Sequence, residues 1–414
     1  MKYSKTIKRC RLCGSYDLKL TLDLGRSALC DQYLKKKKIQ KFFPLRLMLC
    51  GNCKLSQIDT TINKEYIYDD YMYETKSSVT LDRHFYNYAK KVKKKLRLKD
   101  KDLVLDIGSN DGILLKHFKN LKLDILGIEP VSKICEISNR NKIPTTNSYF
   151  DKGVVKKIIS SYKKPKVITI NNLFANVDNL NQFADNLLNL IDDDGTIIIE
   201  SSYLGKIMEN KVFDWIYHEH LSYFSLEPLQ KFFKKKGYKL YNIDITNSKG
   251  GSIRYYFSKE KKNIKANPQI KKMVIIEKNK KYNLILIFKK YKKIIDIEKD
   301  KIVQFLSKNK NKKIVGFGAS ATTTTLLSYF GISKSFRYIV DDNMQKINTY
   351  SPGFYIPVKS ISELTKNLPD VVVIFAWRYE ILIKKRLKLV LKKIRKGNKI
   401  VVITPLPNFK IERI

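Results

Sequence analysis

The densest cluster of titratable side chains is the run Tyr217-His218-Glu219-His220, which holds two of the four histidines of the chain. A histidine near its ordinary pKa can act as a general base at neutral pH, and a tyrosine hydroxyl or a carboxylate beside it can orient a partner. If the segment is extended, His218 and His220 point to one side, and Tyr217 and Glu219 point to the other. A second metal site and a purely structural loop are the alternatives that this run leaves open.

Two Cys-x-x-Cys pairs account for four of the six cysteines. The pairs are Cys10 with Cys13, and Cys50 with Cys53. Thiolates from two such turns can converge tetrahedrally on Zn²⁺, and four of them leave no coordination position for a substrate. The pairs therefore predict a structural Zn²⁺ site in a small N-terminal lobe and a reducing compartment, the alternative being four reduced cysteines without metal. Cys30 and Cys135 are interpreted as buried thiols.

A glycine-rich turn joins a predicted strand to a predicted helix at Val104–Gly112. Its glycines allow the backbone to approach a ligand, and the helix N-terminus that follows favours polar contacts. The D-x-G-x-x-x-G spacing differs from the dinucleotide fingerprint and resembles the S-adenosylmethionine (SAM) motif of class I methyltransferases. Glu129 follows at the end of the next strand, where a carboxylate can bind both ribose hydroxyls. The predicted cofactor contacts are Asp106, Gly108, Asn110, Asp111, Gly112 and Glu129. The alternative is an ordinary strand-to-helix turn with a surface glutamate.

A second glycine-rich turn, Val315–Ala321, also follows a predicted strand. It lacks the third glycine of a dinucleotide motif, because Ala321 and Thr322 occupy that place. Asp341 and Asp342 close the next strand, where acids that bind ribose usually lie. A NAD site and a remnant of a nucleotide- or phosphate-binding site fit this turn equally.

Strands alternate with helices in residues 76–257, which predicts a parallel sheet with helices on both faces. The predicted strands are Leu103–Ile107, Asp124–Ile128, Val167–Ile170 and Thr196–Glu200, with a helix at Leu180–Leu190. A second strand–helix series begins at Lys313. Its strands are predicted at Phe336–Val340, Val371–Phe375 and Lys399–Ile403.

Between the two series, the lysine-rich residues 258–311 predict connecting helices. One helical face is predicted to carry Ile294, Ile297, Ile302 and Phe305. We therefore expect an α/β protein with a zinc-binding lobe (1–75), a Rossmann-like SAM-binding domain (76–257), the connecting helices, and a second Rossmann-like domain (312–414).

The composition is dominated by lysine, with a formal net charge of +43. Such a charge suits a nucleic-acid partner. However, lysine, isoleucine and asparagine are used heavily along the whole chain, as A/T-rich codons would produce, so we expect no nucleic-acid partner. No apolar run is long enough to span a membrane, and no apolar region follows the basic N-terminus, so we expect a cytoplasmic protein with no membrane partner.

These features occur together, in this order, in the sugar-nucleotide C-methyltransferases of deoxysugar pathways, a family that the chain resembles over nearly its whole length. That family joins a zinc-binding lobe, a SAM-binding Rossmann-like domain and a C-terminal Rossmann-like domain. The run Tyr217–Ser225 carries the most specific resemblance. Further matches are the two cysteine pairs, Asp106–Gly112, Gly250–Arg254, Asp341–Asn343 and Tyr350–Gly353.

The resemblance implies a role for each residue of the histidine run. His220 is expected to remove the proton alpha to the sugar ketone, with Tyr217 and Glu219 assisting it. Tyr73, from a tyrosine-rich stretch, is expected to close over the site. The enolate carbon then attacks the SAM methyl group in line, and the nucleotide-sugar substrate is expected between the middle and C-terminal domains.

The chain departs from the family at four places. Thr322-Thr323 stands where Lys-Gly is usual, Asn176 where histidine is common, Arg378 where asparagine is common, and Asn348 where glycine is usual. These changes leave the predicted SAM site and base intact and bear on the identity of the nucleotide and the sugar.

A methyltransferase acting on RNA, DNA or another small molecule is the main alternative. Methylation of base amino groups favours an Asn/Asp-Pro-Pro-Tyr turn, whereas Asn171–Ala175 follows the strand here. Methylation of a cytosine carbon requires a Pro-Cys nucleophile, and neither Cys30 nor Cys135 follows a proline. A non-catalytic nucleotide-binding module and a NAD-dependent dehydrogenase are weaker alternatives, because the histidine run is intact and the first turn has the wrong glycine spacing.

Overall fold

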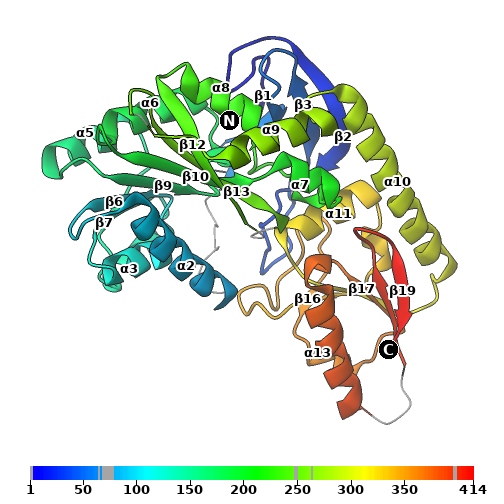
Figure 1. The fold of residues 1–414 in the computed structure, drawn as a ribbon. Helices are drawn as coiled ribbons and strands as arrows, with labels where there is room; N and C mark the ends of the chain where they lie inside the picture. The colour runs from blue at the N-terminus through cyan, green and yellow to red at the C-terminus, as the bar shows by residue number, and fades with distance from the viewer. Residues whose placement is uncertain (1–2, 64–65, 68–78, 247–249, 263, 395–398) are drawn as a thin grey trace.

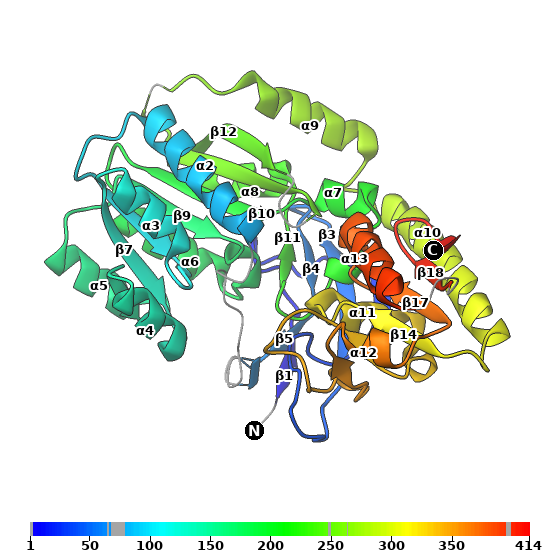
Figure 2. The same ribbon diagram turned by 90° about the horizontal axis from the view of Figure 1, so that it is seen from below.

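The computed structural model describes residues 3–63, 66–67, 79–246, 250–262, 264–394 and 399–414. Figures 1 and 2 show an N-terminal lobe between a larger and a smaller α/β unit. No helix in the described ranges is long and apolar enough to cross a membrane.

The larger unit is built on a seven-stranded sheet in the order β12-β13-β10-β9-β6-β7-β8. Its strands are β6 (Leu103–Ile107), β7 (Asp124–Glu129), β8 (Thr145–Asn147), β9 (Val167–Asn171), β10 (Thr196–Ser202), β12 (Tyr238–Thr246) and β13 (Ser252–Lys259). The five strands from β10 to β8 are parallel, and β13 is antiparallel to both of its neighbours. The chain order reverses between β6 and β9, and a doubly wound sheet binds its ligand at the carboxyl edge of such a switch point.

Helices cover both faces of this sheet, as the strand–helix alternation predicts (Figure 1). They are α2 (Val79–Leu96), α3 (Ile113–Asn120), α4 (Ser132–Arg140), α5 (Lys152–Ser161), α6 (Leu180–Leu190), α7 (Leu204–Glu209) and α8 (Leu226–Lys234). Within β6, Val104 packs in a cluster with α2 and α3, whereas Leu103, Leu105 and Ile107 pack in a cluster with α5, α6 and α8. Both faces are therefore buried, which explains why the strand is apolar along almost its whole length.

The N-terminal lobe contains a four-stranded antiparallel sheet in the order β11-β4-β3-β2 and a small β1-β5 pair. The strands are β1 (Ser4–Thr6), β2 (Leu18–Ser27), β3 (Phe43–Cys50), β4 (Ser56–Ile58), β5 (Thr60–Ile62) and β11 (Ser222–Tyr223). Strand β11 directly follows the histidine run and pairs with β4. The lobe is thus hydrogen-bonded to the segment that carries the candidate base, although the two are far apart in sequence.

Two helices, α9 (Pro268–Lys280) and α10 (Ile285–Lys308), connect the two α/β units. The predicted face of α10 is wrong, because Ile294 and Ile297 are 40% and 53% exposed. The buried positions are Phe288, Tyr291, Ile295, Glu298, Ile302 and Leu306. A buried glutamate, Glu298, interrupts the apolar pattern of this face and hides it from hydrophobic periodicity; its carboxylate accepts the backbone N–H of Phe409 at 2.7 Å.

The smaller unit is a six-stranded sheet in the order β16-β15-β14-β17-β18-β19, parallel except for β19. Its strands are β14 (Ile314–Phe317), β15 (Ile339–Val340), β16 (Val358–Lys359), β17 (Val371–Ile374), β18 (Val401–Thr404) and β19 (Lys410–Arg413). Its helices are α11 (Ala321–Phe330), α12 (Glu363–Lys366) and α13 (Glu380–Lys393). Strand β15 is shorter than predicted, because Phe336 is the C-cap of the short 3-10 helix Ser333–Ser335.

Candidate active site

The turn after β6 has the backbone conformation that its glycines predict. Gly108, Asn110 and Gly112 have positive φ angles of 72°, 51° and 77°, so the chain reverses sharply before α3. A Cβ on Gly112 would lie 2.5 Å from Ser138 Oγ, so only glycine fits the packing between this turn and α4. The turn thus exposes backbone at the carboxyl edge of β6, where the predicted cofactor would lie.

Two buried carboxylates flank the turn. Glu129 Oε2 accepts the Asn110 N–H at 3.1 Å, and its Oε1 accepts the Val131 N–H at 2.9 Å. Asp106 Oδ1 accepts hydrogen bonds from Thr169 Oγ1 at 2.6 Å and Asn171 Nδ2 at 3.2 Å. Burial raises the pKa of Asp106 to about 7 and also raises the pKa of Glu129.

Asp111 is buried beside them, and its N–H is bonded to Asn110 Oδ1 at 2.9 Å. The six residues predicted to contact SAM therefore lie together at the switch point. Each carboxylate oxygen of Glu129 accepts one backbone N–H and keeps a lone pair that can accept a hydroxyl. The individual contacts of these six residues with SAM stay predictions.

We expect Glu129→Gln to weaken SAM binding by about tenfold, because a neutral amide is a poorer acceptor for ribose hydroxyls than a carboxylate. Isothermal titration calorimetry with SAM measures this effect. The matched control is Glu136→Gln on α4, whose side chain is 65% exposed. Equal affinities for the Glu129 variant and the control would contradict the ribose assignment.

The histidine run is a tight turn, so the side-chain alternation that an extended segment would have does not apply to it. Tyr217 Oη lies 3.1 Å from His220 Nε2, with the two rings 4.1 Å apart. His220 Nδ1 lies 3.2 Å from the carbonyl oxygen of Trp215. A carbonyl only accepts, so Nδ1 carries the proton and Nε2 is the basic nitrogen. Burial raises the pKa of Tyr217 well above its usual value, so its hydroxyl stays protonated and donates to Nε2.

The two other members of the run occupy different surroundings. His218 is 1% exposed, and its Nε2 bonds the Pro44 carbonyl of the lobe at 3.1 Å. Glu219 and His218 line a small pocket with Leu29, Cys30, Asp31, Gln32 and Ile67 of the lobe. His218 thus joins the lobe to the turn, and Glu219 faces a hollow that the lobe helps to form.

The burial of His218 predicts a loss of stability in acid. Burial lowers the pKa of His218 to about 4, whereas an unfolded histidine titrates near 6.5. The unfolded chain therefore binds the proton more readily, and the free energy of unfolding falls as the pH drops from about 6.5 to 4, by about 3 kcal/mol in total.

Urea denaturation across this pH range measures the loss. His218→Gln keeps an N–H for the Pro44 carbonyl but does not titrate, so its stability should vary less with pH. Identical pH profiles for the variant and the wild type would show that His218 is not responsible.

The four paired cysteines come together as predicted. Their sulfur atoms all lie within 4.8 Å of one another, with Cys10 Sγ 3.5 Å from Cys53 Sγ and Cys13 Sγ 3.6 Å from Cys50 Sγ. Tetrahedral Zn–S bonds would place the sulfurs about 3.8 Å apart, so the cluster fits Zn²⁺. The hydrogen bond from Cys53 lowers the pKa of Cys10 to about 5, which favours a thiolate there. Cys30 and Cys135 are buried outside the cluster, as expected.

The predicted site residue Tyr73 lies in 68–78, outside the described residues. Sequence reasoning also missed a buried ion pair at the carboxyl end of β10. Glu200 pairs with Arg254 across β10 and β13, and the Arg254 guanidinium lies 3.5 Å from the Tyr88 ring centroid. Burial opposes the charge of Glu200, but the hydrogen bond from His84 and the charge of Arg254 hold its pKa below its usual value. The Gly250–Arg254 match was the available signal for this pair.

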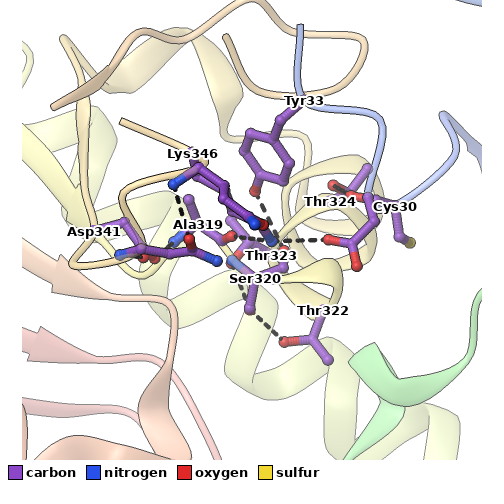
Figure 3. A network of polar contacts seen from close by, with 12 residues as sticks. Cys30, Tyr33, Ala319, Ser320, Thr322, Thr323, Thr324, Asp341 and Lys346 are labelled. Atoms are coloured by element: carbon purple, nitrogen blue, oxygen red, sulfur yellow. Dashed lines mark hydrogen bonds and ion pairs between the residues drawn. The ribbon is translucent and has the colours of Figure 1, made fainter. Parts of the chain in front are cut away.

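The second glycine-rich turn is filled by groups of the chain itself (Figure 3). Asp341 Oδ2 accepts the Ala319 N–H, and Lys346 Nζ donates to the Ala319 carbonyl at 2.9 Å and to Asp31 of the lobe at 2.8 Å. Tyr33 Oη donates to the Ser320 carbonyl at 3.3 Å. Asp341, the aspartate that could bind a ribose, is thus hydrogen-bonded within the turn itself. The contacts made by Asp31 and Tyr33 attach the lobe loop around residues 30–33 to the turn that precedes α11.

Three family models match consecutive parts of the chain. Residues 10–68 match a "putative zinc binding domain", residues 81–243 a methyltransferase domain, and residues 247–407 a C-methyltransferase C-terminal domain. The C-methyltransferase NovU of Streptomyces niveus is 23% identical over 381 residues, which cover 91% of each chain.

Solved structures show weaker likenesses. The magnesium protoporphyrin IX methyltransferase ChlM of Synechocystis PCC 6803 with bound SAH has 12% identity and a TM-score of 0.34, covering 47% of this chain and 91% of its own. The plantazolicin methyltransferase BpumL with an analog and SAH has 14% identity and a TM-score of 0.35, covering 45% and 88%.

The doubly wound sheet and its cofactor turn, with the matching domain model, define a class I SAM-dependent methyltransferase with a zinc-binding lobe. The match to the C-methyltransferase C-terminal domain and the similarity to NovU over 91% of its length narrow this class to enzymes that methylate carbon. The chain is a SAM-dependent C-methyltransferase.

Proposed function

We propose that this enzyme methylates the carbon alpha to the ketone of a nucleotide-linked keto-deoxysugar, through base-catalysed formation of an enolate. The observation that carries the proposal is the His220 imidazole, whose Nδ1 is held by the Trp215 carbonyl so that Nε2 is the basic nitrogen. Carbon methylation needs such a base, because a C–H proton must leave before the carbon becomes nucleophilic. The sugar-nucleotide class rests on the resemblance of the Tyr217–Ser225 run.

The chain's own groups can perform the proton transfer. Nε2 of His220 takes the alpha proton, and the Tyr217 hydroxyl, freed from Nε2, donates to the developing enolate oxygen. Glu219, at the edge of the hollow shared with the lobe, is proposed to orient the sugar. When bound, SAM supplies the electrophilic methyl group for the new carbon–carbon bond. Asp106, Gly108, Asn110, Asp111, Gly112 and Glu129 are proposed to hold it.

Labelled substrate tests the proposal directly. The enzyme is incubated with methyl-labelled SAM and a panel of nucleotide-linked 4-keto-6-deoxysugars, with bulk tRNA in parallel. We expect label in a sugar nucleotide and none in RNA, and retention of the label on carbon after mild hydrolysis. Label only in RNA would show that the alternative, an RNA methyltransferase, is correct.

The four-cysteine site suits a reducing compartment, because its thiols must stay reduced to bind metal. We therefore propose that the reaction takes place in the cytoplasm.

A further inference from the structure

A buried carboxylate lies three residues before the start of the histidine run. Asp214, in the 3-10 helix η3 (Phe213–Trp215), is 0% exposed. Burial of a charge is costly unless it is paired and hydrogen-bonded. Both partners come from the C-terminal unit: Trp377 Nε1 donates to Oδ2 at 2.9 Å, and Arg378 donates to Oδ1 at 2.7 Å and more weakly to Oδ2 at 3.4 Å. The carboxylate therefore ties η3 to the short 3-10 helix η6 (Trp377–Tyr379) that follows β17.

The same short helix is held on its other side by aromatic packing. The Phe213 ring stacks on Phe330 of α11 at 5.2 Å and meets Tyr329 edge-on at 5.4 Å. The Trp215 indole N–H bonds Ser202 Oγ, at the end of β10, at 2.8 Å. Each residue of η3 is thus fixed by a different element, which leaves its backbone little freedom to rotate.

The backbone carbonyl of Trp215, the last residue of η3, orients the candidate base His220. The Trp215 carbonyl follows Asp214 directly, and it accepts from His220 Nδ1 at 3.2 Å and from Tyr223 Oη at 3.4 Å. A rotation of η3 would move this oxygen away from Nδ1. The imidazole could then carry its proton on Nε2, the nitrogen that must be unprotonated to act as a base.

We propose that Asp214, held by Trp377 and Arg378, is a positioning residue for His220, so that the C-terminal unit sets the tautomer of the base. The expected effect on the rate rests on the proposed function of His220. The expected effect on the tautomer of the imidazole does not. The ion pair places the Trp215 carbonyl, and the carbonyl keeps the proton on Nδ1. None of these residues needs to touch the substrate.

Three variants test this chain of contacts. Asp214→Asn keeps the size of the side chain but turns an amide toward Arg378. Arg378→Asn removes the cation, whose side chain is 17% exposed and therefore tolerates replacement better. Arg378→Lys keeps a cation without the planar pair of donors and should lie between Arg378→Asn and the wild type. Asp244→Asn is the matched control, because Asp244 is also a buried carboxylate that joins elements far apart in sequence, here β12 to Lys91 of α2.

The decisive readout is the tautomer of His220, measured by long-range ¹H–¹⁵N correlation on the full chain with labelled histidine, and assigned with His220→Ala. We expect a single tautomer protonated on Nδ1 in the wild type and the control, and a mixture in Asp214→Asn and Arg378→Asn. In these two variants kcat should fall roughly ten- to a hundredfold, with KM for SAM unchanged.

An unchanged tautomer in both Arg378→Asn and Asp214→Asn would overturn the inference, whatever happens to the rate. If Asp214→Asn does not fold, the Arg378 variants decide alone. If the tautomer changes but the alpha proton still exchanges normally, the positioning role of Asp214 is supported. The same result would disprove the proposed role of His220 as the base.

Discussion

His220→Ala should lower kcat for methyl transfer by about a thousandfold while leaving the affinity for SAM unchanged. A positioned general base contributes about 10²–10⁴-fold to a rate, and Nε2 of His220 is the basic nitrogen of this site. SAM affinity is unaffected because the imidazole belongs to the turn beside the lobe and not to the turn after β6. Initial rates with a sugar nucleotide that accepts label, and calorimetry with SAM, measure the two quantities separately.

Proton exchange distinguishes the loss of a base from a general disturbance of the site. In deuterated solvent without SAM, the wild type should incorporate deuterium at the carbon alpha to the ketone, and His220→Ala should not. His218→Gln is the matched control, since His218 is two residues away but bonds the Pro44 carbonyl. Unchanged exchange in His220→Ala would mean that another residue removes the proton.

The sequence predicts the scaffold of the SAM site closely. Strand β6 and helix α6 have the predicted bounds, because a strand that is apolar except for Asp106 and an amphipathic helix each carry a pattern set by local geometry. Gly108 and Gly112 have positive φ angles, which glycine adopts without strain because it lacks a Cβ. The face of α10 could not be predicted this way, because the partners of the buried Glu298 include the backbone of Phe409, 111 residues away.

The turn that carries His220 shows what composition and spacing leave out. The types of Tyr217 and His220 suggest general base chemistry, but an extended segment would separate them, whereas the observed turn places them 3.1 Å apart. The turn exists because β11 pairs with the lobe and η3 packs on α11, and both contacts are long-range. Asp214 was missed for the same reason: its partners Trp377 and Arg378 lie more than 160 residues away, with separations of 163 and 164.

The zinc site should have the largest effect on stability. Cys50→Ser removes a fully buried ligand at the end of β3, and loss of a structural Zn²⁺ can remove on the order of 10 kcal/mol of folding free energy. Helices α10 and α11 both contact β2, which pairs with β3, so the damage should spread beyond the lobe to the turn that carries His220. By elemental analysis we expect one Zn²⁺ per chain in the wild type and less than one in the purified variant. We also expect trypsin to cleave the variant rapidly in the lobe. Chelation of the wild type should reproduce the cleavage, and added Zn²⁺ should restore protease resistance.

The control variant is Cys135→Ser, which removes a buried thiol outside the cluster and should keep its zinc. A Cys50 variant with full zinc content and normal protease resistance would rule out the four-cysteine site. Because the lobe supplies Leu29–Gln32 to the hollow beside Glu219, the metal would support catalysis without touching the substrate.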